Sequence, residues 1–464
     1  VTWDFGLSQR YSVSFFTSCF DDSSVRIMIG DEMTIRYDGN EGPPWSANGF
    51  VIKIPDTNSE EVVLELQPGA NPPTELTSNF SIDFVWSGIT YDRIQYSLKQ
   101  FAADEYSVSG YIYHKLLGHE VNSQFFDTEI PEDLSVPGIA ELNESQLDAV
   151  TSVLRSPLSL IQGPPGTGKT VVSTSIVYHL RRMTKEAVLV CAPSNVAADQ
   201  LADRIDKTGL NVVRLIAKSR ENVISDNIKE LSLSSKVFSD PKANRELVKL
   251  EQLKDVLGEL SAQDRLKHAR LLRKSEIALI ENADVVVCTC SAAGDRRLSN
   301  IRFRTVLIDE STQATEPECL IPIVHGCKQL ILVGDHQQLG PVVGYKPASN
   351  AGLSKSLFER LVVLDHTPIR LTVQYRMHPC LSEFPSNMFY DGSLQNGVTR
   401  QQRERFGLDF PWPVPENPMM FWSIIGQEEI SSSGTSYLNR AERNWSFLRI
   451  CQEAYRYGNA DDNS

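Results

Sequence analysis

A glycine- and proline-rich segment, GPPGTGKT, has the composition of a phosphate-binding loop. The apolar run LSLI precedes it and the helix-forming run TVVSTSIVYHL follows it, which predicts a turn between a buried strand and a helix. Backbone N–H groups in such a turn face phosphate oxygens, and the helix N-terminus adds partial positive charge. A lysine here reaches the β- and γ-phosphates and a hydroxyl can bind Mg²⁺. The predicted nucleotide-binding residues of this loop are Gly163, Pro164, Pro165, Gly166, Thr167, Gly168, Lys169 and Thr170.

Two adjacent acids follow a second apolar run in TVLIDEST. Asp309 at the end of a buried strand can hold a metal ion, together with Thr170, and Glu310 can take a proton from an attacking water. An acid pair at the end of a strand is also common in solvated loops. Beside a phosphate loop, the pair predicts hydrolysis of a nucleoside triphosphate, with Lys169, Asp309 and Glu310 as catalytic residues.

A third apolar run ends in the polar sequence GDHQQLGP. Its Gln338 could orient water or sense the γ-phosphate, whereas an isolated His336 is more often structural. The paired acids and the absence of an NKxD motif argue against a GTPase. The chain length and the GDHQQLGP segment argue against a small-molecule kinase.

Composition sets wider limits on the protein. The chain has 464 residues, 41% of them hydrophobic and 22% charged, which predicts two or three globular cores. The net charge of −14 argues against a protein that coats nucleic acid through bulk charge, although a narrow basic groove is compatible with it. The eight cysteines form no CxxC pair, so a reducing intracellular compartment is expected. No uninterrupted apolar stretch of about 18 residues predicts a membrane span.

Two different patterns of apolar residues divide the chain into two parts. The first 90 residues predict a small β-barrel or sandwich from short strands at YSVSFF, VRIMIG, EMTIRY, GFVIKI, EVVLEL and FSIDFVW. Helices are expected at YDRIQYSLKQFA and GYIYHKLLG. Near-continuous apolar runs then alternate with helices and predict a doubly covered parallel sheet with strands at LSLIQG, AVLVCAPS, NVVRLIA, ADVVVCTC, TVLIDE, KQLILVGD and PIRLTVQY. A charged, leucine-containing stretch at 227–280 predicts an inserted helical hairpin.

The motifs taken together resemble those of superfamily 1 helicases, and more narrowly the up-frameshift helicase family, the RNA-dependent ATPases of nonsense-mediated mRNA decay. The resemblance rests on LNESQ, GPPGTGKT, CAPSNVAADQL, DESTQATEPE, GDHQQLGP, QYRMHP and FPSNMFYDGSLQNGV, in that order. It covers essentially the whole chain and implies an α/β fold with RecA-like P-loop domains. The domains it implies are a β-barrel accessory domain at 1–90, a first RecA-like domain at 91–226 and 281–366, a helical insertion at 227–280, and a truncated second RecA-like domain at 367–464.

The resemblance also implies roles for residues outside the loop. Gln146 would contact the adenine edge, although LNESQ also fits a helix start with Asn143 as N-cap. Tyr375 would stack on adenine, and Gln338 would couple nucleotide state to the second lobe. Arg376 would approach the γ-phosphate as a catalytic arginine finger, with a buried ion pair as its alternative role.

Ser194 and Asn195 of APSN would contact the RNA backbone, and a plain N-cap by Ser194 is the alternative. The expected cofactors are ATP and Mg²⁺. The expected partners are single-stranded RNA, with DNA as a second option, and factors of nonsense-mediated decay, in the cytoplasm and without a membrane. Movement from 5′ to 3′ is implied by the family alone.

The family's pattern continues beyond the sequence given, and the chain starts at Val1. We therefore expect a segment of a longer protein, without the zinc module and most of the second lobe. The final stretch, with Trp445, Leu448, Cys451 and Tyr455 on one face, predicts an amphipathic helix. Two hypotheses follow for function: an ATP-driven helicase, or, for the chain as given, an ATP- and RNA-binding module with little turnover.

Overall fold

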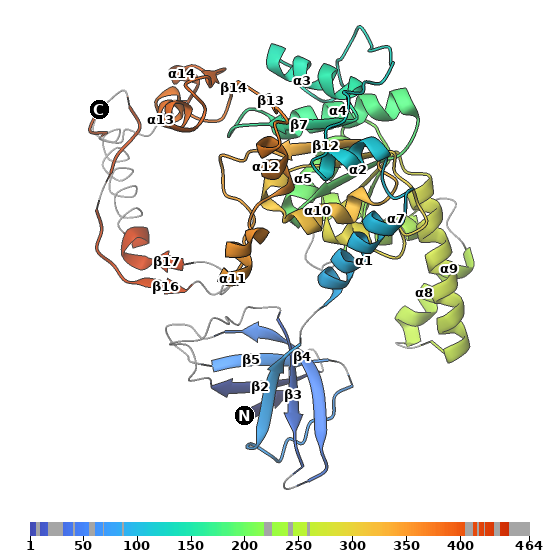
Figure 1. Ribbon diagram of the computed structural model, residues 1–464. Helices are drawn as coiled ribbons and strands as arrows, with labels where there is room; N and C mark the ends of the chain where they lie inside the picture. Colours follow the sequence, from blue (N-terminus) through green and yellow to red (C-terminus); the bar gives the residue numbers. More distant parts are fainter. Residues whose placement is uncertain are drawn as a thin grey trace, which may run out of the picture. The chain divides into compact units, whose positions relative to one another are not determined.

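The computed structural model describes most of the chain in two compact units, one formed by Val1–Gly88 with Arg405–Ser464 and the other by Ile89–Glu404 (Figure 1). The described residues are 1–5, 10–16, 31–39, 42–54, 61–67, 69–85, 88–217, 225–239, 245–257, 260–403, 412–414, 417–421, 423–430 and 437–444. No helix among them is long and apolar enough to cross a bilayer.

Among its described residues, the first unit contains a six-stranded antiparallel sheet in the order β1-β2-β5-β4-β3-β6. Its strands are β1 (Thr2–Phe5), β2 (Tyr11–Phe16), β3 (Glu32–Tyr37), β4 (Trp45–Lys53), β5 (Glu61–Leu66) and β6 (Phe80–Phe84). Alternate residues of β5, namely Val62, Leu64 and Leu66, are buried, as the two-residue repeat of a half-buried strand requires. The indole ring of Trp3 in β1 lies 5.5 Å from the ring of Phe80 in β6, so the sheet curls until its two end strands approach. This is the barrel-like form that the sequence predicts.

The predicted strands of this unit are present where the structure describes them. VRIMIG lies outside the described residues, and the sequence prediction missed β1, whose four residues are too few for a recognisable repeat. The same unit includes a hairpin of β16 (Glu428–Ile430) and β17 (Tyr437–Asn439). The predicted amphipathic helix with Trp445, Leu448, Cys451 and Tyr455 also lies outside the described residues.

The second unit is built on a seven-stranded sheet in the order β13-β7-β12-β11-β8-β10-β9, in which all neighbouring strands are parallel. The strands are β7 (Leu158–Gln162), β8 (Val188–Ala192), β9 (Val212–Arg214), β10 (Val285–Thr289), β11 (Thr305–Ile308), β12 (Gln329–Gly334) and β13 (Ile369–Arg370). Every residue of β8 and of β12 is buried, because helices cover both faces. The fold is therefore the predicted α/β type.

Alternate residues of β8 point into different hydrophobic cores. Leu189 and Cys191 belong to a core lined by α2, α10 and α12, whereas Val188 and Val190 belong to one lined by α3, α4 and α5. The helices on the two faces are α1 (Ile89–Ala103), α2 (Gly110–Leu116), α10 (Glu316–Ile323) and α12 (Leu357–Val363) on one, and α3 (Glu144–Arg155), α4 (Lys169–Thr184) and α5 (Asn195–Asp206) on the other. Short helical turns η2 (Ser291–Gly294) and η3 (Ser311–Gln313) follow β10 and β11.

The described residues of the inserted segment between β9 and β10 form four helices where one hairpin was predicted. They are α6 (Asp226–Leu231), α7 (Leu233–Ser239), α8 (Arg245–Leu257) and α9 (Ala262–Glu281). The hairpin is α8 with α9, which projects from the rest of the unit (Figure 1). Ile228 and Leu231 of α6 pack into the core beside α5, so the first part of the insertion is a covering layer.

The segment after β12 contains short elements: α11 (Lys346–Ala348), η4 (Ser349–Leu353), α13 (Pro379–Phe389), α14 (Arg400–Arg403) and the parallel pair of β14 (Val373–Gln374) with β15 (Gln395–Asn396). The predicted strand PIRLTVQY is divided in two: β13 pairs with β7 at the sheet edge, and β14 pairs with β15. Residues 367–403 lie in the same compact unit as the parallel sheet. The assignment of residues 367–464 to a second RecA-like domain stays a prediction.

Candidate nucleotide-binding site

The loop of residues 163–170 joins β7 to α4 and makes a tight turn. Gly166 and Gly168 have φ angles of 79° and 84°, in the left-handed region that glycine adopts without steric cost. A Cβ atom on Gly163 would collide with Cγ of Lys169, so a side chain there would displace the lysine. The carbonyl oxygen of Pro164 accepts hydrogen bonds from the N–H and the hydroxyl of Thr167, at 3.3 and 2.8 Å. The sequence thus shapes the turn through close backbone packing.

Several backbone donors of this loop remain available to a ligand. Within the described part of the chain, no hydrogen bond is recorded for the N–H groups of Gly166, Gly168, Lys169 or Thr170. The last three of these groups lie at the start of α4, where the helix dipole favours negative charge. The residues therefore fit a bound polyphosphate.

Lys169 and the acid pair meet at the same edge of the sheet. Nζ of Lys169 donates to the carbonyl oxygen of Gly163 at 3.1 Å and lies 3.4 Å from Oε1 of Glu310. Glu310 has a φ of 50°, an uncommon angle for a residue with a side chain, which marks the turn after β11 as strained.

Asp309 is almost completely buried, with 3% of its surface exposed. Burial raises the pKa of its carboxyl group to about 7, with a further increase from the Glu310 charge and opposing effects of Lys169 and the Glu310 N–H. A buried carboxyl group without a full ion pair is a group that a divalent cation would stabilise in its charged form. Asp309 and the Thr170 hydroxyl therefore have the chemistry of Mg²⁺ ligands.

Tyr375 and Arg376 lie against the loop although they follow it by some two hundred residues. The N–H of Tyr375 donates to the carbonyl oxygen of Gly166 at 2.9 Å, and a Cβ atom on Gly166 would lie 2.5 Å from Cβ of Arg376. Arg376 is exposed, and no hydrogen bond or ion pair of its guanidinium group is recorded among the described residues. The alternative of a buried ion pair for Arg376 is therefore wrong.

Gln146 is buried, and its side chain is used by the protein itself. The amide oxygen accepts from the N–H of Asn143, the side chain of Asn143 accepts from the N–H of Gln146, and together they form a capping box. The amide Nε2 donates to the carbonyl oxygen of Thr167 at 3.0 Å. The capping alternative is thus confirmed, and it joins the start of α3 to the loop. Asn143 also donates to the hydroxyl oxygen of Tyr375, at 2.9 Å.

Gln338 follows β12, and its amide donates to Oδ2 of Asp335 at 2.7 Å. His336 stacks on the ring of Phe358, with 5.7 Å between ring centroids, so it has a packing role. Gln162, the last residue before the loop, donates to Oδ1 of the same Asp335. The base of the loop and the predicted γ-phosphate sensor are therefore joined through one carboxylate.

Ser194 and Asn195 lie at the end of β8, on the same edge of the sheet but without a recorded contact to the loop. Ser194 caps α5 by accepting from the N–H of Ala197 at 3.2 Å, so the N-cap alternative is confirmed. Asn195 Oδ1 accepts from Nη2 of the fully buried Arg214, at 3.1 Å. Since a guanidinium group only donates, Asn195 must turn its oxygen inward and its NH₂ group outward. This orientation suits a contact with a phosphate oxygen.

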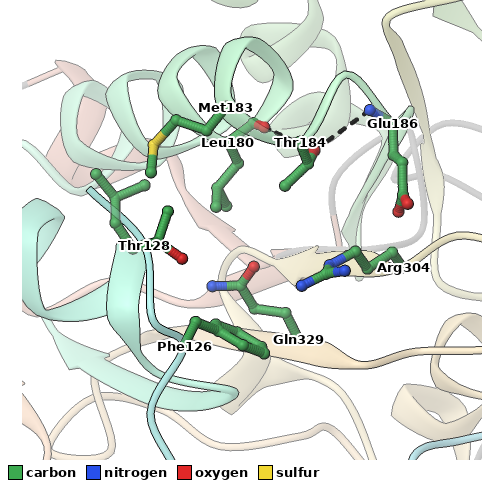
Figure 2. A pocket seen from close by; sticks show the side chains of 9 residues that line it. Phe126, Thr128, Leu180, Met183, Thr184, Glu186, Arg304 and Gln329 are labelled. Atoms are coloured by element: carbon green, nitrogen blue, oxygen red, sulfur yellow. Dashed lines mark hydrogen bonds between the residues drawn. The ribbon is translucent and has the colours of Figure 1, made fainter. Parts of the chain in front are cut away.

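A depression lies at the opposite, amino-terminal edge of the sheet. It has a volume of about 220 Å³ and lies beneath the end of α4, near Leu180 and Met183 (Figure 2). Figure 2 shows Arg304 and Gln329 close to the ring of Phe126; the guanidinium carbon of Arg304 lies 5.2 Å from that ring's centroid. It contains none of the predicted site residues.

Two residues of the site were not found from the sequence, Asp335 and Arg214. Asp335 had a usable signal, because it follows an apolar strand as Asp309 does. Arg214 had a weaker one: it is a charged residue inside the apolar run NVVRLIA. Neither signal says which partner the side chain would meet.

Comparison with known proteins agrees with this geometry. One AAA-domain model matches residues 141–271 and 239–346, and a second matches residues 353–459. A model of the RNA helicase UPF1 1B domain matches residues 1–85. The Regulator of nonsense transcripts 1 homolog of Neurospora crassa is 59% identical over 95% of this chain and 40% of its own length. The ATP-dependent helicase NAM7 of Saccharomyces cerevisiae is 55% identical over 99% of this chain and 47% of its own length. A solved arterivirus nonstructural protein 10 helicase with DNA matches with a TM-score of 0.32 at 11% identity, over 83% of this chain and 58% of that one, which is too weak a likeness to support an argument.

The parallel sheet, the loop before α4 and the AAA-domain matches define the class of the second unit as a P-loop nucleotide-binding protein. Within that class the chain belongs to the family of the regulators of nonsense transcripts 1, the up-frameshift family whose motifs it carries. It spans about half or less of the length of these curated relatives.

Proposed function

We propose that this chain is the ATP-hydrolysing part of a helicase that moves on single-stranded RNA in nonsense-mediated mRNA decay, in the cytoplasm. The observation that carries the proposal is the convergence of Lys169, the acid pair and Arg376 on one glycine-rich loop. Similarity to proteins that include an ATP-dependent helicase supports the same activity. Action on DNA and contact with decay factors belong to the same proposal, which takes them from the family.

The residues divide the chemistry of hydrolysis between them. The backbone N–H groups of residues 163–170 and the Lys169 ammonium group would hold the phosphates of ATP, and Glu310 would accept the proton of the attacking water. Thr170 and Asp309 would hold Mg²⁺, which when bound neutralises charge on the phosphate oxygens. Arg376, beside Gly166, would stabilise negative charge that develops on the transferred phosphoryl group, and Gln338 would orient the water or sense the γ-phosphate.

Gln146 and Tyr375 would border the adenine. The capping box already uses the Gln146 side chain, so it would act mainly by fixing the loop through Thr167. Tyr375 has a half-exposed ring beside the loop, which is suited to stacking. Ser194 and Asn195 would contact the RNA backbone without reading its sequence.

The test is ATP hydrolysis with and without single-stranded RNA, in this chain and in a form extended at its C-terminus. We expect the extended form to turn over well and to be stimulated by RNA. Lys169→Ala should reduce its turnover by about 10²–10³-fold, because a charge that stabilises the transition state is lost. Lys185→Ala, at the far end of α4, is the matched control and should leave turnover unchanged.

An extended form that hydrolyses ATP equally well with Lys169→Ala would overturn the proposal. ATP and RNA binding without turnover in both forms would instead support a binding module. Equal turnover by the two forms would show that residues 1–464 suffice for hydrolysis.

A further inference from the structure

A buried carboxylate, Asp335, lies directly behind the proposed γ-phosphate sensor. Only 1% of its surface is exposed, and no ion pair with a lysine or arginine is recorded for it in the described ranges. Its oxygens accept four hydrogen bonds from neutral donors: Oδ1 from Gln162 and from the N–H of Gln337, both at 3.2 Å, and Oδ2 from Gln338 at 2.7 Å and Tyr390 at 2.6 Å. A buried charge of this kind is stabilised only while its donors stay in place.

The donors come from three separate segments of the second unit. Gln162 ends β7, Gln338 follows β12, and Tyr390 is the C-cap residue of α13. Arg370 holds two of them together, since its Nε donates to Oε1 of Gln162 at 3.0 Å and its Nη1 to the carbonyl oxygen of Tyr390 at 3.4 Å. The end of α13 is thereby fixed to the base of the phosphate loop.

Gln338 and Tyr390 donate to the same oxygen atom, Oδ2 of Asp335. A carboxylate oxygen has two lone-pair directions, so one donor settles the direction that is left for the other. The Tyr390 hydroxyl group thus sets the carboxylate orientation that receives the Gln338 amide. Burial and the Asp335 charge raise the pKa of Tyr390 above its usual range, so the hydroxyl group keeps the proton that it donates to Asp335.

We propose that Tyr390 is a positioning residue for ATP hydrolysis: its hydroxyl group, donated to Asp335, orients the carboxylate that holds the Gln338 side chain at the nucleotide site. The proposal rests on the proposed function, in which Gln338 orients the water or senses the γ-phosphate. Under this proposal, the position of α13 affects the geometry of the catalytic site through Tyr390. A displacement of α13 removes the hydroxyl group from Asp335, and Gln338 then loses its defined orientation.

The test is a double-mutant cycle on steady-state ATP hydrolysis by the full-length protein, with Tyr390→Phe, Gln338→Ala and the double variant. Tyr390→Phe removes one hydroxyl group and keeps the ring. We expect it to lower kcat roughly tenfold, the effect of one lost hydrogen bond to a charged group, with KM for ATP nearly unchanged. In the Gln338→Ala background the same substitution should have no further effect, because Tyr390 acts through Gln338. Tyr106→Phe, at a tyrosine that is 74% exposed, is the matched control.

Two results would overturn this inference. One is a Tyr390→Phe variant with the kcat of the parent protein, and the other is an equal loss of kcat with and without Gln338. A lower melting temperature without a change in kcat belongs to the first result, since a purely structural role predicts it. Should Gln338→Ala or Lys169→Ala leave turnover intact, the proposed function itself fails. Active-site variants that behave as proposed, beside an unaffected Tyr390→Phe, refute the role of Tyr390 alone.

Discussion

Asp284 and Gln329 at one edge of the parallel sheet differ from Asp309 and Arg376 at the other in how far the protein pairs them. At the amino-terminal edge, Asp284 accepts from Arg181 and from the N–H of Asn211, and Gln329 donates to the carbonyl oxygens of Val153 and Ser156. At the carboxyl-terminal edge, Asp309 is buried without a full ion pair, and Arg376 has none recorded within the described ranges. Asp284 and Gln329 therefore make stabilising contacts, whereas Asp309 and Arg376 keep charges that a ligand can use. Buried polar groups without partners reduce stability. The carboxyl-terminal edge carries this cost because its groups must be free to bind a ligand.

The largest expected effect concerns Asp309. Its pKa is about 7 in the folded protein against 3.8 for an ordinary aspartate, so the folded state holds a proton that the unfolded state has lost between these values. Stability therefore falls as pH rises through this window, by on the order of 4 kcal/mol at most, at 1.36 kcal/mol per pKa unit. Asp309→Asn should be more stable than the parent protein at pH 8 and similar to it near pH 4, while losing ATP turnover. Urea unfolding without nucleotide at both pH values measures the difference.

If Asp309→Asn and the parent protein differed in unfolding free energy by the same amount at both pH values, the buried charge of Asp309 would not destabilise the protein at pH 8. The comparison between the two edges would then lose its main support.

A smaller effect of opposite sign is expected at the other edge. Asp284→Asn removes the charge that pairs with Arg181, at 2.7 Å, and weakens the bond from the N–H of Asn211. Both side chains of the pair are about one-quarter exposed, so we expect a loss of about 1–2 kcal/mol of unfolding free energy. ATP turnover below the melting temperature should be unchanged. A variant that keeps its stability but loses turnover would contradict the division between the edges.

The smallest effect is a pH dependence of the amino-terminal edge. Burial lowers the pKa of His325, which lies just before β12 and contacts the carbonyl oxygen of Ala293 at 2.8 Å. The unfolded chain therefore takes up this proton first, and the stability that His325 contributes is lost as pH falls below about 6.5. His325→Gln should lose less stability than the parent protein between pH 7 and pH 5, as measured by thermal unfolding. Identical losses in both proteins would exclude a contribution from His325.

How far the sequence predicts this molecule depends on how local each feature is. The buried strands were recognisable because apolar runs such as those of β8 and β12 have no other common explanation. The division of PIRLTVQY was not recognisable, since Ile369 pairs with β7 and Val373 with β15, and pairing partners are set by tertiary contacts. The glycines made the loop predictable. The packing of Arg376 on Gly166 was not predictable, because it depends on the path of the intervening chain.

The site itself divides in the same way. Lys169, Asp309 and Glu310 follow from motif chemistry, and their proximity follows from the rule that the carboxyl ends of parallel strands share an edge. Asp335, Tyr390 and Arg214 act through partners that are distant in the sequence, and no spacing rule predicts such partners. The roles of the residues in catalysis and RNA binding stay predictions that the proposed experiments test.

The close approach at Gly166 has a consequence for genetics. A methyl group at this position would collide with the Cβ atom of Arg376. The segment with Arg376 could move away only if the hydrogen bond from the N–H of Tyr375 to the Gly166 carbonyl oxygen were broken. Alleles of Gly166 should therefore share the phenotype of alleles of Arg376 and Tyr375. A suppressor of a Gly166 allele should be sought in the segment around residues 373–377, where a small shift of the backbone restores the fit.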